Sequence, residues 1–152
     1  MVINRLLAIR AEIEEVLRDL KVDSLSNSEW DRLGDLQKLL APFKEQTDHL
    51  QTDTLSMSAV IPSLVELSLH LQDPTLPAIY STKLLQSLRS RFACFLDPTD
   101  AQFSALPAAA CYLDPTVSTV MIRDDMQPLV LAAKNYIKAH VSGVFVLFIW
   151  IF

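Results

Sequence analysis

Apolar residues recur at steps of three and four positions along most of this chain, which is the spacing of one face of an α-helix. The first such run covers residues 2–20. Its apolar positions are Leu6, Ile9, Ile13, Val16, Leu17 and Leu20, and its acidic positions on the other side are Glu12, Glu15 and Asp19. The pattern predicts an amphipathic helix over residues 2–20 that breaks in the segment 21–27.

A second helix is predicted to begin at Ser26. Glu29 follows three residues later, and this pair is typical of a capping box, in which the hydroxyl and the carboxylate satisfy free N–H groups of the new helix. The predicted buried stripe consists of Trp30, Leu33, Leu36 or Gln37, Leu40 and Phe43. Pro42 removes a backbone donor, so the helix is expected to kink or end a turn before it. Residues 45–53 are then a helix tail and a loop.

Two further helices are predicted in the middle of the chain. The first covers residues 57–71, with a buried face of Val60, Ile61, Leu64, Leu67 or Ser68, and Leu71. A stiff turn with prolines at 74 and 77 separates it from the second, over residues 79–95. That helix is expected to bury Leu84, Leu88, Phe92 and Phe95, to point Arg89 and Arg91 outward, and to stop at Asp97-Pro98.

The tetrapeptide Leu-Asp-Pro-Thr occurs at residues 96–99 and 113–116. We interpret both copies as helix ends, where proline stops the helix and the aspartate caps a turn. Residues 107–112 are apolar and short, so a helix turn and a strand are both open there. A last helix is predicted over 126–139, with Leu129, Val130 or Ala133, Tyr136 and Ile137 facing inward.

The segment 141–152 is an almost wholly apolar tail. It is shorter than the roughly 20 residues of a membrane-spanning helix, and its aromatic and β-branched residues make it prone to aggregation if exposed. Three interpretations stay open: a membrane anchor, a strand or helix docked on the domain, and an extension unrelated to the rest of the chain. The predicted domains are therefore residues 1–140 and the tail 141–152.

Composition favours one folded all-α domain. Hydrophobic residues make up 51% of the 152 positions and charged residues 20%, as in globular proteins. There are only two glycines, too few for a hairpin-rich β fold, and no glycine-rich phosphate loop. The prediction is a bundle-like assembly of four to six helices. The net charge of −5 and the thin spread of basic residues predict no autonomous binding to nucleic acid.

Candidate chemical groups give weak patterns. Asp97, Asp114, Asp124 and Asp125 are acids of the kind that bind divalent metals, but neighbouring carboxylates diverge on a helix, and solvated acids or caps are the favoured interpretation. The three histidines (His49, His70 and His140) lack a nucleophilic partner in any motif and are expected at surface or half-buried positions. The two cysteines (Cys94 and Cys111) lie in apolar surroundings and are expected to be buried free thiols. No apolar signal segment follows Met1, so a reducing intracellular compartment is expected.

The order of several short motifs resembles the helical region of hAT-superfamily transposases and the zinc-finger BED-domain proteins derived from them. The resemblance covers roughly residues 1–120, and leucine spacing by itself is generic. The matching residues are Trp30, Leu39-Leu40-Ala41-Pro42-Phe43, Thr47, Leu55-Ser56, Ile61-Pro62, Arg91-Phe92 and Leu113-Asp114-Pro115. The family's last motif continues with two basic residues, whereas this chain has Thr116 and Ser118 in their place.

That resemblance implies the helical insertion domain of an RNase H-like transposase without its catalytic core. In the family, the catalytic aspartates lie upstream of the matched region and the glutamate lies downstream in a block that residues 140–152 do not resemble. Cys94 and Cys111 do not supply a BED finger, which needs two cysteines and two histidines. The expectation is thus a non-enzymatic module with no catalytic residue, metal or cofactor.

The expected partner is another protein or an intact transposase-like parent, in the nucleus by resemblance and otherwise in the cytoplasm. The candidate interaction residues are Trp30, Pro42, Phe43, Leu113, Asp114 and Pro115. For Trp30, packing in the core is favoured over stacking on a nucleic-acid base, because it shares the stripe with Leu33 and Phe43. The alternative is a small membrane-associated helical protein held by residues 141–152.

Overall fold

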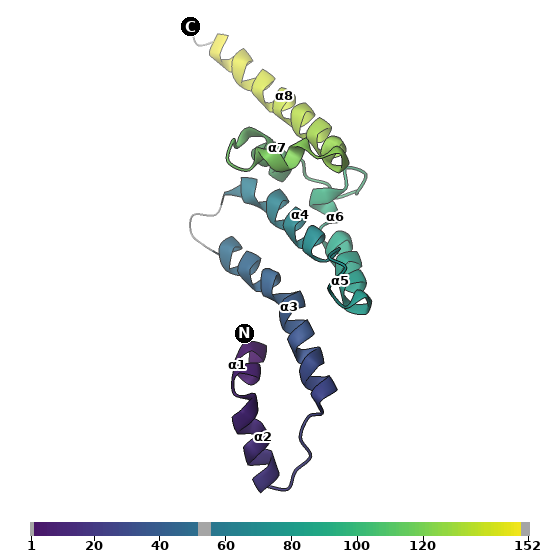
Figure 1. Cartoon of the computed structure of the whole chain (residues 1–152). Helices are drawn as coiled ribbons and strands as arrows, with labels where there is room; N and C mark the ends of the chain where they lie inside the picture. The colour runs from purple at the N-terminus through teal and green to yellow at the C-terminus, as the bar shows by residue number, and fades with distance from the viewer. Residues whose placement is uncertain (1, 52–55, 150–152) are drawn as a thin grey trace.

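The computed structural model describes the backbone of residues 2–51 and 56–149, and the side chains of these residues up to position 140. Within these ranges the chain forms eight α-helices and three short 3₁₀ helices, without a strand (Figure 1). This confirms the predicted all-α class. The helices outnumber the expected four to six because two of the predicted helices are each divided in two.

The first division lies at Ile9, which separates α1 (Val2–Ala8) from α2 (Arg10–Asp19). Ile9 has φ −107° and ψ 24°, away from helical values. The backbone N–H of Ile9 still donates to Arg5 O at 3.2 Å, and that of Ile13 donates to Ile9 O at 3.0 Å. The predicted helix over 2–20 is therefore wrong in its continuity, while its end before residue 21 is confirmed.

Helix α3 (Asn27–Leu50) begins with the predicted capping box. The Glu29 N–H donates to Ser26 Oγ at 3.4 Å, and the Ser26 N–H donates to a Glu29 carboxylate oxygen at 2.8 Å. Pro42 does not end the helix, which continues for two more turns and changes direction along its length (Figure 1). A proline costs an interior helix one hydrogen bond, and the packing of both halves of α3 offsets that loss.

The buried positions of α3 are Trp30 and Leu39, whereas the predicted stripe contained Leu40, which is half-buried. The reason is that α3 has two different neighbours: α1 packs against it near one end and α4 near the other. The prediction assumed one buried face along the whole helix, whereas α3 buries different faces against its two neighbours.

The middle of the chain follows the prediction closely. Its elements are the 3₁₀ helix η1 (Met57–Ala59), α4 (Val60–His70), α5 (Ala78–Arg91) and α6 (Ala93–Leu96). The predicted helix over 79–95 is interrupted at Phe92, with φ −109° and ψ 20°. Arg89 and Arg91 are exposed, as expected, and the helix ends before Asp97. Val65, which the predicted face of α4 omitted, is buried.

The last part consists of α7 (Leu106–Leu113), the 3₁₀ helices η2 (Ser118–Ile122) and η3 (Asp124–Met126), and α8 (Gln127–Ile149). Residues 107–112 are thus helical, which settles the choice between helix and strand. Helix α8 continues ten residues beyond the predicted end at 139. The side chains of the tail 141–152, and Leu55 of the Leu55-Ser56 motif, lie outside the described residues.

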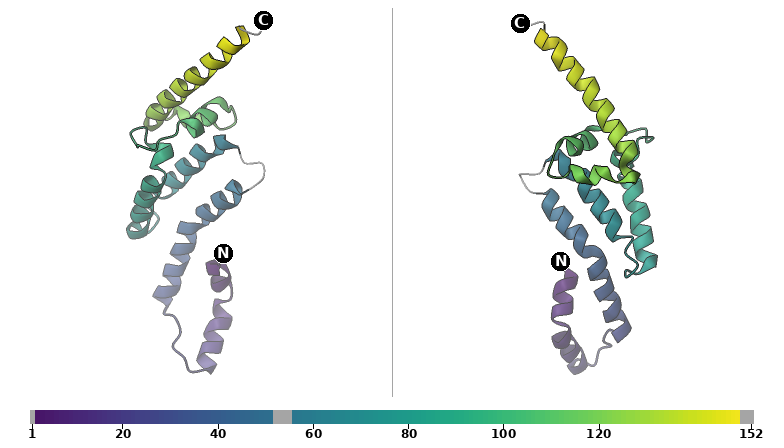
Figure 2. Two further views of the ribbon diagram at one scale, coloured as in Figure 1. Left: turned by 180° about the vertical axis from the view of Figure 1, so that it is seen from behind. Right: turned by 45° about the horizontal axis from the view of Figure 1, so that its top comes forward.

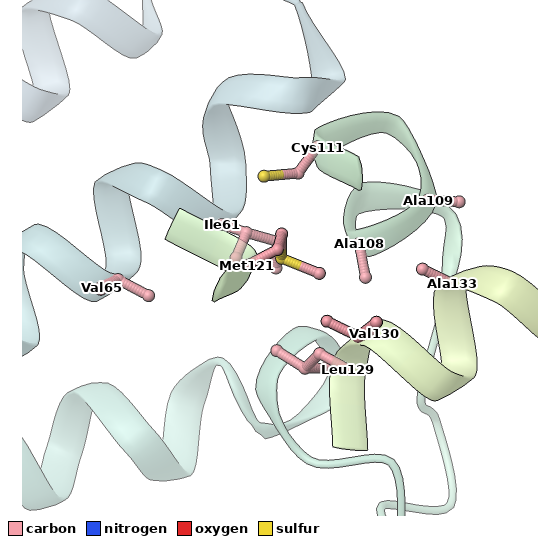
Figure 3. Packing of buried hydrophobic residues seen from close by; sticks show 9 residues of the cluster. All are labelled: Ile61, Val65, Ala108, Ala109, Cys111, Met121, Leu129, Val130 and Ala133. Atoms are coloured by element: carbon pink, nitrogen blue, oxygen red, sulfur yellow. The ribbon is translucent and has the colours of Figure 1, made fainter. Parts of the chain in front are cut away.

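Two clusters of buried apolar side chains hold α4 between its neighbours. One joins α4 to α7, η2 and α8 (Figure 3), and its buried members are Ile61, Val65, Ala108, Ala109, Cys111, Met121, Leu129, Val130 and Ala133. The other joins α4 to α3 and α5, and its buried members are Leu39, Leu64, Leu67, Leu71, Leu76 and Leu88. The small alanines of α7 allow α8 to approach it closely, and these two helices form the most extensive packing in the fold.

The helices do not gather into one bundle. Helices α1, α2 and α3 form one end of an elongated molecule, α4 to α7 form the middle, and α8 projects from the opposite end (Figures 1 and 2). Neither α1 nor α2 buries a side chain fully. Most of the burial therefore lies in the part that follows Trp30.

Candidate functional site

A groove of about 500 Å³ lies between α4, the α5–α6 junction and the start of α8. We call it the α4–α8 groove. Its walls are mostly apolar, with Val65, Leu69, Leu96, Met126 and Leu129 among them. A volume of this size, lined by apolar side chains and bordered by a few charges, is typical of a binding pocket.

Charged residues border this groove. Arg123 donates to both carboxylate oxygens of Asp125, from Nε and from an Nη atom, at 3.0 Å each. These bonds raise the pKa of Arg123 and lower the pKa of Asp125 from their ordinary values. Arg89 of α5 also lines the groove and is exposed. No described residue forms an ion pair with Arg89, so it remains available to an external acid.

A second groove, of about 460 Å³, lies between α3, α4 and α5. Phe43, a candidate from sequence, contributes to its wall together with Leu64, Leu84 and Phe92. Pro42 is half-buried one position before Phe43. These two candidates thus belong to the middle of the molecule, and Phe43 lines a surface hollow as well as packing on the second cluster.

Trp30 lies elsewhere, at the α1–α2–α3 end of the molecule. It is 2% exposed, and the guanidinium carbon of Arg10 lies 5.2 Å from the ring centroid. Arg10 also donates to Asn27 Oδ1 at 2.6 Å, which ties α2 to the start of α3. The buried position agrees with the favoured packing role and leaves no ring face free for a nucleic-acid base in this conformation.

The remaining candidates, Leu113, Asp114 and Pro115, lie at the end of α7. Leu113 and Pro115 are exposed and Asp114 is half-buried. A carboxylate oxygen of Asp114 accepts a hydrogen bond from Ser58 Oγ at 2.6 Å, across 56 positions of sequence. The six candidates from sequence are therefore spread over three places and do not form one site. Of the two grooves described above, Phe43 lines the second, and the other five candidates line neither.

The Asp-Pro-Thr sequence occurs in three turns of the same geometry, after α4, α6 and α7. In each turn one oxygen of the aspartate accepts from the threonine N–H at 2.8–3.0 Å and from its hydroxyl at 2.6–2.7 Å. This confirms the predicted capping role of the two Leu-Asp-Pro-Thr copies. The third copy, Asp73-Pro74-Thr75, shows the same arrangement. These bonds lower the pKa of Asp73 and Asp97. The pKa of Asp114 is lowered first by the bond from Ser58 and then by the bonds from Thr116.

The turn at Asp114 is expected to matter most for stability, because it alone adds the bond from Ser58. Asp114→Ala should lower the thermal midpoint more than Asp73→Ala or Asp97→Ala, and Ser58→Ala should account for much of the difference. Circular dichroism melting of the four variants measures this ranking. Equal losses in the three aspartate variants would contradict a special role for the Ser58–Asp114 contact.

Acid should weaken these turns. A carboxyl group whose pKa is lower in the folded state stabilises the fold at pH values above its unfolded pKa of about 3.9, and the stabilisation is lost as the pH falls through the folded value. We expect the urea midpoint of the wild type to fall between about pH 5 and pH 2, and to fall less steeply in Asp114→Asn. Asp124→Asn serves as the control, and equal slopes in both variants would contradict the prediction.

Cys111 is a buried free thiol and Cys94 a half-buried one. Burial, with a smaller contribution from the nearby charge of Asp114, raises the pKa of Cys111 to about 11. Since the thiolate is the nucleophile, Cys111 should resist alkylation. In the folded protein at pH 8 we expect iodoacetamide to modify Cys94 first and Cys111 only on unfolding, as followed by mass spectrometry of the peptides. Equal rates for both thiols would contradict this.

The histidines lie at exposed or half-buried positions, as predicted. His70 Nε2 lies 3.3 Å from Leu39 O and so links α4 to α3. His140 stacks on Tyr136 with ring centroids 4.0 Å apart, and its Nδ1 lies 2.8 Å from Tyr136 O. The described residues contain no group of three or more His, Cys, Asp and Glu side chains arranged to hold a metal ion.

Among the described helices, none combines the length and the apolar character that crossing a bilayer requires. Comparison of the chain with protein-family models, with curated proteins and with solved structures finds no match.

Proposed function

We propose that this chain is a non-catalytic helical module, derived from the insertion domain of a hAT-like transposase, that binds other proteins through the α4–α8 groove. The observation that carries the proposal is the groove itself, with apolar walls and a free guanidinium at its edge. The transposase origin, the nuclear location and the lack of enzymatic activity rest on the resemblance of the ordered motifs.

The groove specifies the chemistry of the partner. Its volume of about 500 Å³ suits two or three apolar side chains of a short peptide segment. Arg123 is already satisfied by Asp125, whereas Arg89 offers planar, fork-like donors that match a carboxylate. The proposed ligand is therefore a protein segment that carries apolar side chains next to an acidic residue.

A displayed peptide library tests this. Peptides are selected on the immobilised full-length protein, with the bare support as the counter-selection, and are then measured against Leu69→Glu, which introduces a charge into the groove wall. Enriched peptides should contain apolar residues near an acid and bind the wild type with micromolar affinity. They should bind Leu69→Glu and Arg89→Glu at least about tenfold more weakly, a difference of about 1.4 kcal/mol.

Two matched variants control for general effects of charge. Leu131→Glu changes an exposed leucine of α8, and Lys83→Glu changes an exposed base of α5, and neither residue lines the groove. Both should bind the selected peptides like the wild type. Peptides that bind all four variants equally would show that they bind elsewhere and would contradict the proposal.

The proposed lack of nuclease activity has its own test. Purified protein with Mg²⁺ or Mn²⁺ should leave supercoiled DNA and terminal-repeat duplexes intact, because the family's catalytic carboxylates belong to stretches that this chain does not resemble. The net charge of −5 also opposes binding to a polyanion. Metal-dependent nicking that copurifies with the protein would overturn this part of the proposal.

A further inference from the structure

Four apolar side chains form an exposed row along α1 and α2. Val2, Ile9 and Val16 follow one another at seven-residue steps, and Leu20 lies one helical turn further. Their exposed fractions are 80%, 49%, 56% and 66%. We call this row the N-terminal stripe. Residues seven apart lie on nearly the same side of a continuous helix, and such a repeat is the pattern of helices that pair along their length. The interruption at Ile9 divides this row between α1 and α2, but the half-buried positions keep their three- and four-residue spacing on both sides of it.

The stripe is not the face that packs on α3. The half-buried side chains of α1 and α2 are Ile3, Leu6, Leu7, Arg10, Ile13, Glu14 and Leu17. They share a neighbouring face of the helix, and Arg10 on that face reaches Trp30 and Asn27 of α3. Counted from α2 alone, Val16 and Leu20 lie about 90° around the helix from the middle of this face, at 100° per residue. Within the described part of the chain, nothing covers it fully.

The charged residues beside the stripe indicate which partner is complementary to it. Arg5, Glu12 and Asp19 form a second row at the same seven-residue steps, all exposed. The row is basic at one end and acidic at the other. A second copy lying antiparallel places Arg5 of each chain opposite Asp19 of the other, with Glu12 facing Glu12 at the centre. A parallel copy places the row against the opposite flank of the partner's stripe, where Leu6 and Leu17 lie, and so pairs none of these charges.

We propose that the N-terminal stripe binds a second copy of this chain, with the two α1–α2 segments antiparallel about a two-fold axis. Such an isologous contact is the commonest form of self-association. Helices α1 and α2 have 7 and 10 residues, about 10 and 15 Å at 1.5 Å per residue. We expect a contact limited to two such short helices to be small beside the roughly 1,200–2,000 Å² of stable interfaces, and the dimer to be reversible with a micromolar dissociation constant. This contact is separate from the α4–α8 groove and does not depend on the function proposed for it.

Sedimentation equilibrium of the full-length chain, from about 5 to 500 µM, tests the proposal. The wild type should follow a monomer–dimer equilibrium within this range. Val16→Glu, which introduces a charge into the centre of the stripe, should be monomeric throughout, with an unchanged urea midpoint because Val16 is exposed. Ile79→Glu changes an equally exposed apolar residue of α5 and should associate like the wild type.

Charge exchange tests the orientation. Arg5→Asp and Asp19→Arg alone should each weaken the dimer by about two- to fivefold, the range of exposed ion pairs. The double variant should recover the wild-type constant, and Glu12→Gln should tighten the dimer by removing the like-charge pair. A wild type that stays monomeric, as it would if the stripe served a different protein or a membrane, overturns the proposal. So does association that Val16→Glu leaves intact, or a double variant that recovers nothing.

Discussion

Replacing Ile61 with alanine should lower the free energy of unfolding by about 2–5 kcal/mol, one of the two largest effects expected for a single substitution in this chain. Ile61 is 0% exposed and lies where α4 meets Met121 of η2 and Ala108 of α7 (Figure 3). Alanine removes three carbon atoms from a contact shared by four elements. Small domains are stable by only about 5–15 kcal/mol, so the loss is a large part of the total.

Equilibrium urea unfolding followed by circular dichroism at 222 nm measures this change. The matched control is Ile79→Ala, the same substitution at a position that is 68% exposed, where the effect should stay within about 0.5 kcal/mol. Similar losses for the two variants would mean that the cluster around Ile61 does not contribute as described. A change in the slope of the unfolding curve would indicate that the two ends of the molecule unfold separately.

Replacing Trp30 with alanine should release one end of the molecule and leave the rest folded. Loss of a buried tryptophan costs about 3–5 kcal/mol. Here the loss falls on the packing of α1 and α2 against α3, because the two apolar clusters of the α4–α8 part contain no residue of α1 or α2. Hydrogen exchange read by mass spectrometry should show faster exchange in residues 2–20 and unchanged protection in α4 and α7.

Trp30→Phe separates the apolar contact from the indole itself. The Nε1 donor of Trp30 is buried without an acceptor, and an unmatched buried donor is costly by about 1–3 kcal/mol. Phenylalanine keeps most of the ring contact and removes this donor, so its effect should be far smaller than that of alanine. Exchange that rises equally over the whole chain in Trp30→Ala would contradict a local role.

The starts and ends of several helices could be predicted from the sequence, because a few residue types favour one local conformation there. Ser26 and Glu29 predict the start of α3, and the Asp-Pro pairs predict the ends of α4, α6 and α7, because proline and short polar side chains act within one turn. The interruptions at Ile9 and Phe92 involve neither glycine nor proline, so no local rule indicates them. Leu39 replaces Leu40 in the core because the neighbours of α3 are determined by the tertiary packing.

The candidate site was harder to predict. The α4–α8 groove draws on short stretches between residues 65 and 129, and no motif connects them in sequence. The motif residues that the resemblance singled out have other roles: Trp30 packs beside Arg10, and Asp114 caps a turn beside Ser58. Phe43 lines the second groove. The order of motifs is a property of the sequence, whereas a groove is a property of how distant segments meet.

Helix α3 links the two proposed binding surfaces of this molecule, the N-terminal stripe and the α4–α8 groove. With 24 residues it is about 36 Å long; α1 packs near one of its ends and α4 near the other, so it joins the α1–α2 end to the α4–α8 part. The N-terminal stripe and the α4–α8 groove share no residue, so we expect both to be occupied at the same time. In that case α3 is a spacer of fixed length, and a chain paired through its N-terminal end would present two grooves to a multivalent partner, with a gain in avidity that needs no new contact.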